Sequence, residues 1–175
     1  GNTQLNSMSK RRINKVAVVG SGIMGSAIAC HFANIGVEVL LLDIIPRELT
    51  DKETAKGQTL EDKQVRNRLV NQALANAIKS KPAPLYNSAF AKRIKTGNLE
   101  DDIAKVAGVD WIIEVVIERL DIKQKLFENL EKHRTPGTLI TSNTSGIPIG
   151  FMSEGRSEDF QAVSYTHLRA HETLD

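Results

Sequence analysis

The sequence predicts an α/β fold with a doubly wound, mainly parallel sheet, and three observations support this prediction. Short, continuously apolar runs recur along the chain, as expected for strands that are covered on both faces. Longer segments of mixed polarity separate these runs. A glycine-rich turn joins the first run to the segment after it. Strands and helices in this alternating order are typical of parallel sheets flanked by helices.

Four apolar runs are the predicted strands of this sheet. Each is short and rich in Val, Ile or Leu, which suits a buried parallel strand. The runs are Val16 to Val19, Val39 to Leu42, Trp111 to Ile113 continuing through Val115 to Ile117, and Leu139 to Ile140.

Three segments between the strands are predicted helices. The segment from Ile23 to Ile35 is rich in Ala, Met and Ile and ends at Gly36, a residue type that readily takes the left-handed conformation beyond a helix end. From Leu60 to Ile78, the apolar residues fall on one stripe of a 3.6-residue period. The third helix is predicted to be capped by Asp121 and to stop before Pro136.

The composition excludes several classes of protein. The 175 residues are 41% hydrophobic and 25% charged, which is ordinary for a globular domain. The net charge of +2 favours neither a nucleic-acid partner nor an anionic membrane. Cys30 is the single cysteine, so no internal disulfide can form. The longest apolar stretch, Val37 to Ile45, contains Glu38 and Asp43 and is too short to span a membrane. We therefore expect a cytoplasmic protein.

The glycine-rich turn predicts a phosphate-binding site. Gly20, Gly22 and Gly25 follow the first strand and open the first helix. In a G-x-G-x-x-G turn, the first glycine allows the tight turn, the second lets the backbone approach a pyrophosphate, and the third lets helix and strand pack closely. The helix N-terminus then faces the anion. The predicted cofactor-binding residues of this turn are Gly20, Ser21, Gly22, Ile23, Met24 and Gly25.

Asp43 predicts which dinucleotide binds. It ends the second predicted strand, 18 positions beyond Gly25. A carboxylate there accepts hydrogen bonds from a ribose hydroxyl and repels a 2′-phosphate, which favours NAD over NADP. Arg47, four residues further on, is the one nearby charge that argues against this preference. Together, the turn and Asp43 predict a Rossmann-type fold that binds NAD.

Four stretches of the chain resemble, in order and spacing, the NAD-binding domain of the 3-hydroxyacyl-CoA dehydrogenases of fatty-acid β-oxidation. They read KVAVVGSGIMGSAIA, LLLDI, WIIEVVIERLDIK and SNTSGIPI, and the resemblance runs from about Lys15 to about Phe160. The resemblance implies that Glu118 and Lys123 lie beside the dinucleotide near its nicotinamide half. It also implies that Ser145 is catalytic and hydrogen-bonds the 3-oxygen of the substrate.

The chain departs from this family where the general base should stand. The family places a histidine in a G-x-H-F-F-N-P-like strand about twenty residues after the S-N-T-S motif, with a glutamate downstream that orients it. His167 lies 22 residues after Ser145, but neither that motif nor the glutamate follows it. We therefore do not expect His167 to be the base. His167 and His171 lack a third ligand in a supporting context, so no metal is predicted.

Two segments flank the predicted domain, which covers residues 15–161. We expect residues 1–14 to form an N-terminal tail and residues 162–175 to form a second tail of non-native origin. Within the second tail, VSYTHLRAHET resembles the translation of a transposase adapter used to prepare sequencing libraries. On this interpretation, the domain is cut before the family's histidine and before its helical domain.

Several of these residues have simpler interpretations. Glu118 and Lys123 could be solvated charges at a helix start, and Ser145 could be a turn residue. Glu114, inside an apolar strand, is expected to be a hydrogen-bonded structural carboxylate, because a buried charge must be paired or neutralised. The stretch from Gln58 to Lys95 carries eight Lys and Arg against two acids, which fits either a solvated face or a face that steers the CoA phosphates.

The resemblance implies the oxidation of (S)-3-hydroxyacyl-CoA to 3-oxoacyl-CoA with NAD. The partner would be an acyl-CoA substrate, and a homodimer is expected only for the full-length enzyme. Without the histidine, this fragment should be inactive alone. Two alternatives stay open: another β-hydroxyacid or 6-phosphogluconate-type dehydrogenase, and a non-catalytic dinucleotide-binding or crystallin-like relative.

Overall fold

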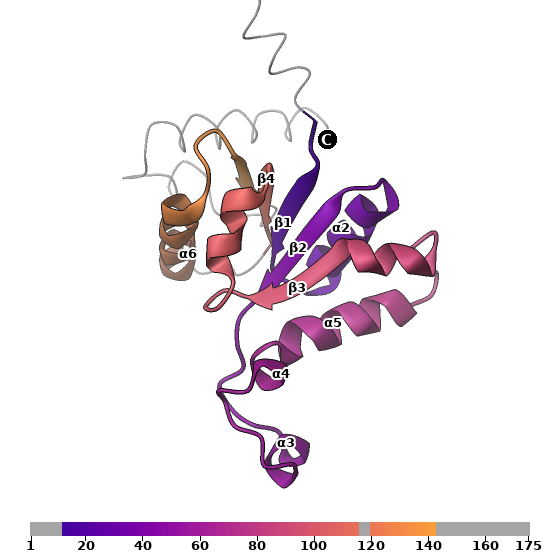
Figure 1. The fold of residues 1–175 in the computed structure, drawn as a ribbon, viewed down its shortest axis with the longest axis vertical. Helices are drawn as coiled ribbons and strands as arrows, with labels where there is room; N and C mark the ends of the chain where they lie inside the picture. Colours follow the sequence, from indigo (N-terminus) through magenta and orange to yellow (C-terminus); the bar gives the residue numbers. More distant parts are fainter. Residues whose placement is uncertain (1–11, 116–119, 143–175) are drawn as a thin grey trace, which may run out of the picture.

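In the part of the chain that the structure describes, five parallel strands form one sheet in the order β3-β2-β1-β4-β5 (Figure 1). The computed structural model describes residues 12–115 and 120–142 of the chain. The strands in this part are β1 (Lys15–Val19), β2 (Glu38–Asp43), β3 (Ile94–Asn98), β4 (Trp111–Glu114) and β5 (Leu139–Ser142). The predicted doubly wound, mainly parallel sheet is thereby confirmed.

Helices and 3-10 helices connect the strands. The helices of the described ranges are α2 (Ile23–Asn34), α3 (Asp51–Ala55), α4 (Lys63–Arg66), α5 (Arg68–Lys79) and α6 (Leu120–His133). Two 3-10 helices, η1 (Ser88–Arg93) and η2 (Ile103–Gly108), lie on either side of β3 in the chain. Over residues 12–115 and 120–142, no helix is both long and apolar enough to cross a membrane.

Both faces of the sheet are covered. Successive side chains of a strand point to opposite faces, so the neighbours of alternate residues in β1 show what covers each face. Ala17 and Val19 of β1 belong to a buried cluster with Phe127 of α6. Val16 and Val18 belong to the cluster on the other face, which includes Ala29, Cys30 and Ala33 of α2 and Val70 of α5. The continuous apolar run of β1 therefore reflects burial on both sides.

The edge strand β3 was not among the predicted strands. Its sequence, IKTGN, has one large apolar residue, Ile94, and its neighbour Lys95 is exposed. The strand pairs with β2 from Val39↔Ile94 to Asp43↔Asn98. Since an edge strand has only one neighbour and here presents a lysine to solvent, it lacks the apolar run by which buried strands are recognised.

The helix predicted from Leu60 to Ile78 is divided into α4 and α5. The division falls at Asn67, whose side-chain oxygen accepts a hydrogen bond of 2.8 Å from Asn98 of β3. The apolar stripe did not reveal this tertiary contact. Two further differences concern helices: α3 was not predicted, and α6 is assigned from Leu120, one residue before the predicted cap at Asp121.

Of the eight basic residues from Gln58 to Lys95, the three arginines are held by other groups of the fold. Arg66 pairs with Asp101 at 2.8 Å and with Glu100 at 3.2 Å. Arg68 pairs with Glu53 of α3 at 3.0 Å. Arg93 donates to a backbone carbonyl of α2 and lies over an aromatic ring of η1. The three arginines are thus structural, which leaves only the lysines of the stretch for a solvated or ligand-binding face.

The ion pair of Arg66 should make stability depend on pH in the acid range. Hydrogen bonds from Arg66 and Asn98 lower the pKa of Asp101 from 3.8 to about 2. A lowered pKa means that the stabilisation is present above the ordinary value and is lost as pH falls toward the folded value. The deficit of Arg66→Met in unfolding free energy is therefore expected to be full near pH 5 and to shrink between about pH 4 and pH 2.

Urea unfolding at several pH values would measure this deficit. Lys92→Met, at an exposed residue of η1, is the matched control and should cost little at any pH. A deficit of Arg66→Met that stays constant from pH 5 to pH 2 would contradict the role given to Asp101.

Candidate functional site

The glycine turn lies at the point where the strand order reverses. The chain builds β1, β2 and β3 to one side and then returns to place β4 on the other side of β1. The amide of Val115, just after β4, donates to the carbonyl of Val19 at 2.9 Å. Ligands of open α/β sheets bind at this carboxyl edge, at the switch point.

Two glycines of the turn are required by the backbone itself. Gly20 has a φ of 110°, which strains any residue with a side chain, and its amide donates to Leu42 at 2.7 Å. A Cβ on Gly25 would lie 1.7 Å from the carbonyl oxygen of Gly20. The first turn of α2 can therefore approach the end of β1 only because position 25 has no side chain.

Gly22 differs from these two because the space around it is open. A Cβ there would meet nothing within 4 Å, and its backbone is extended with a φ of −60°. The next two residues, Ile23 and Met24, are 95% and 56% exposed although both are large and apolar. The first amides of a helix have no acceptor within the helix and carry its positive dipole end. The turn thus has the open space and the donors that a pyrophosphate requires.

Asp43, the last residue of β2, lies against this turn. Its Oδ2 accepts hydrogen bonds from the Ser21 amide at 3.0 Å and from the Ser21 hydroxyl. Its Oδ1 accepts from the Ile44 amide at 2.7 Å. The structure therefore brings the predicted turn and the predicted carboxylate together. The spacing of the motif gave no sign that Ser21 joins them.

Lys123 occupies a different environment from the one expected of a solvated charge. Its Nζ lies 3.3 Å from Oε2 of Glu114, and both side chains are 0% exposed. Ser142 donates from Oγ to the same Oε2 at 2.6 Å and lies 3.4 Å from Nζ of Lys123. The interpretation of Lys123 as a solvated charge is wrong. Glu114 is hydrogen-bonded and paired, as expected of a buried carboxylate.

This buried group lies at the carboxyl ends of β4 and β5, the same edge of the sheet as the glycine turn, since Glu114 and Ser142 end those strands. Ser142 was not among the predicted site residues, although it is the first serine of the S-N-T-S motif. Glu118 and Ser145 lie outside the described residues.

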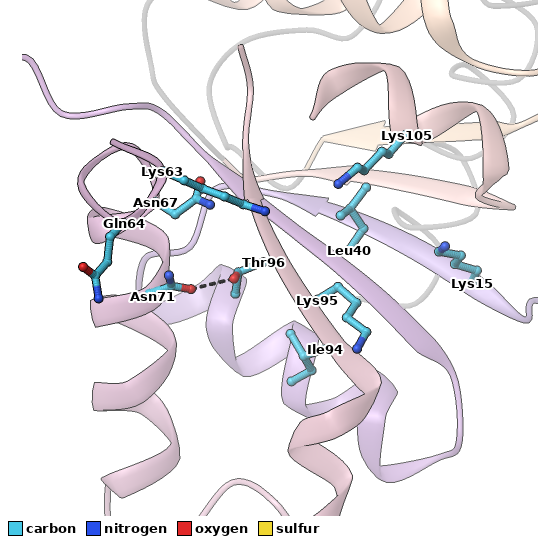
Figure 2. Close-up of a pocket in the computed structure, with 10 residues that line it drawn as sticks. All are labelled: Lys15, Leu40, Lys63, Gln64, Asn67, Asn71, Ile94, Lys95, Thr96 and Lys105. Atoms are coloured by element: carbon cyan, nitrogen blue, oxygen red, sulfur yellow. Dashed lines mark hydrogen bonds between the residues drawn. The ribbon is translucent and has the colours of Figure 1, made fainter. Parts of the chain in front are cut away.

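A hollow lies around the edge strand β3, and none of the predicted site residues lines it. It has a volume of about 810 Å³, and Figure 2 shows four lysines around it: Lys15, Lys63, Lys95 and Lys105. The ammonium of Lys105 is paired with Asp102 at 2.8 Å. Lys63 and Lys95 belong to the basic stretch, for which the steering of the CoA phosphates stays a prediction.

A parallel sheet, a glycine turn at its switch point and an acidic residue ending the next strand define a Rossmann-type dinucleotide-binding domain. The chain belongs to the family described as 3-hydroxyacyl-CoA dehydrogenase, NAD binding domain, whose model matches residues 15–169. The match extends beyond residue 161, where the predicted domain ends. NAD is the cofactor of this family, and the geometry of the turn fits it.

Curated relatives carry the same family name. The chain is 52% identical over 152 residues to a protein of Bacillus subtilis (strain 168) named Probable 3-hydroxyacyl-CoA dehydrogenase. It is 45% identical over 150 residues to a protein of that name from Deinococcus radiodurans. These matches cover 87% and 86% of the chain but only 19% and 39% of the two relatives. The chain thus spans a minor part of each.

Solved structures share the fold. The chain superposes with a TM-score of 0.57 on 3-hydroxybutyryl-CoA dehydrogenase from Escherichia coli K12, at 28% identity, covering 85% of this chain and 28% of that one. The TM-score is also 0.57 for (S)-3-hydroxybutyryl-CoA dehydrogenase PaaH1 from Ralstonia eutropha, at 26% identity, covering 85% and 47%.

The two kinds of glycine in the turn should respond differently to alanine. Gly25→Ala is expected to lower the free energy of unfolding by about 1–3 kcal/mol, because the backbone must move to admit the methyl group. Gly22→Ala should change it by less than about 0.5 kcal/mol and should weaken NAD binding at least about tenfold, because its methyl group enters the space expected for the pyrophosphate. Chemical unfolding and NAD titration would separate the two effects. A Gly22→Ala variant that binds NAD like the wild type would contradict this assignment.

The buried ion pair of Lys123 and Glu114 predicts that substitutions of the two residues will not have additive effects on the free energy of unfolding. Lys123→Met removes the cation beside a buried carboxylate and is expected to cost about 3–5 kcal/mol. The double variant Lys123→Met/Glu114→Gln should recover most of that loss, because the remaining amide can still accept from Ser142. Urea unfolding of both variants would measure the difference. Equal stability of the single and double variants would mean that the pair carries no net charge–charge stabilisation.

Proposed function

We propose that this chain is the cofactor-binding part of an NAD-dependent enzyme that oxidises (S)-3-hydroxyacyl-CoA to 3-oxoacyl-CoA. The observation that carries the proposal is the turn at residues 20–25, which is open at Gly22 and holds Asp43 beside it. The names of the relatives favour an acyl-CoA substrate over other β-hydroxyacids and over a non-catalytic role. Because the chain spans a minor part of those relatives, the activity belongs to the longer protein.

The turn and Asp43 would divide the binding of NAD between them. The first amides of α2 would donate to the pyrophosphate, with Gly22 leaving the space that the phosphates need. Asp43 would accept hydrogen bonds from the adenosine ribose and would repel a 2′-phosphate. Ser21, Ile23 and Met24 complete the proposed cofactor contacts of the turn.

The opposite half of the site would orient the reacting groups. NAD, when bound, supplies the hydride acceptor of the reaction. Lys123 and Glu118 are proposed to lie beside the nicotinamide half, and Ser145 to hydrogen-bond the 3-oxygen of the substrate. The ammonium of Lys123 would approach the cofactor from its buried pair with Glu114, which fixes its position at the end of β4. The general base would come from the longer protein.

The remaining proposals concern the cellular setting. We propose a cytoplasmic location, an acyl-CoA substrate, no nucleic-acid partner, and a homodimer for the full-length enzyme. The sequence supports these through its near-neutral charge and its family resemblance.

Cofactor preference tests the proposed role of Asp43. The chain should bind NAD at least about tenfold more tightly than NADP, because a 2′-phosphate would face a carboxylate. Asp43→Asn should narrow this gap. Titrating both nucleotides against each variant gives the ratio. Glu38→Gln, at the opposite end of the same strand, is the matched control and should leave the ratio unchanged. Equal or tighter binding of NADP by the wild type would contradict the assignment.

The rate of NADH formation tests the expectation that this chain lacks the general base. The 175-residue chain should form NADH from 3-hydroxyacyl-CoA at least about 10²–10⁴ times more slowly than a complete enzyme, because no oriented general base is expected in it. The measurement is the rise in NADH absorbance on mixing chain, NAD and substrate. Substantial turnover that His167→Ala abolishes would show that His167 is the base after all.

A further inference from the structure

We infer that Ser21 is a positioning residue whose hydroxyl fixes the Asp43 carboxylate and thereby sets the preference for NAD over NADP. The inference deepens the proposed function and rests on it, since it concerns the same cofactor site. Ser21 occupies a variable position of the glycine motif, so the motif alone assigns it no side-chain role.

The contacts of Asp43 are unequally divided between its two oxygens. Oδ2 accepts from both the amide and the hydroxyl of Ser21, and Oδ1 accepts from the Ile44 amide at 2.7 Å. A carboxylate has about four acceptor sites, two on each oxygen. Oδ2 is therefore fully used by Ser21, and Oδ1 keeps one acceptor site for a ribose hydroxyl.

Ser21 is itself held firmly enough to act as an anchor. Its residue is 2% exposed, and its carbonyl accepts a hydrogen bond of 2.6 Å from the hydroxyl of Ser26 on α2. Its neighbour Gly20 is tied to β2 through Leu42. The Ser21 side chain therefore points to Asp43 and away from the open space at Gly22, so its hydroxyl serves the carboxylate and not the phosphates.

Fixing the carboxylate has opposite consequences for the two cofactors. A carboxylate held in one orientation offers Oδ1 to a ribose hydroxyl at no cost in side-chain entropy. The same fixed charge cannot turn away from a 2′-phosphate, so the like-charge repulsion is retained in full. Without the Ser21 hydroxyl, only the amide would hold Oδ2, and the carboxylate could rotate away from the phosphate.

A double-mutant cycle on the 175-residue chain tests this inference. Ser21→Ala should weaken NAD binding, leave NADP binding equal or tighter, and so lower the NAD/NADP affinity ratio about three- to tenfold. In an Asp43→Ala background, Ser21→Ala should leave the ratio unchanged, because the group it positions is absent. Isothermal titration with NAD and NADP gives all four ratios.

Two further variants keep the result interpretable. Ser21→Gly removes the same hydroxyl and replaces Ser21→Ala if that variant fails to fold. Thr138→Ala removes another buried hydroxyl, which bonds the Val109 carbonyl at the opposite edge of the sheet, and it should leave the ratio unchanged whatever its effect on stability.

The outcomes separate the inference from the proposed function. NAD binding with a ratio that Ser21→Ala and Ser21→Gly leave unchanged would overturn the inference alone. An equal fall of the ratio in the Asp43→Ala background would also overturn it, because Ser21 would then act without the carboxylate. A wild-type chain that binds neither nucleotide would overturn the proposed cofactor site, and the inference with it.

Discussion

The close backbone approach of the start of α2 to Gly20, just after β1, is the constraint on which the rest of the site depends. A Cβ at Gly25 would lie 1.7 Å from the carbonyl oxygen of Gly20, so the two elements can meet only at a glycine. This contact places the first turn of α2, with its unpaired amides, at the switch point of the sheet. It also places Ser21 where both its amide and its hydroxyl reach Asp43.

The two halves of the site are organised by different physics. On the β2 side, backbone geometry and hydrogen bonds fix the half-buried carboxylate of Asp43 beside the glycine turn. On the β4 and β5 side, a buried ion pair between Glu114 and Lys123 fixes the geometry, and Ser142 donates a hydrogen bond to the same carboxylate. A charge pair removed from water holds its geometry only if its partners stay paired.

The sequence predicted what local patterns encode and missed what distant contacts decide. The buried strands, the helix ending before Gly36 and the turn with Asp43 follow from apolar runs and from glycines with backbone tasks, and Gly36 indeed has a φ of 88°. The strand β3 was not predicted, because this edge strand lacks an apolar run. Asn67 divides a helix through its bond to Asn98, and Lys123 is buried by its pairing with Glu114. Those partners lie 31 and 9 residues away in the chain, beyond the reach of periodicity.

The central claim is that residues 20–25 and Asp43 form one NAD-binding unit. Amide chemical shifts of the isotope-labelled 175-residue chain, followed by NMR during NAD addition, test it most directly. The account predicts the largest changes at Gly22, Met24 and Ile44, with little change at Asn71 and Lys95 around the lysine-lined hollow. Changes centred on that hollow, or no change at the turn with saturating NAD, would contradict the account.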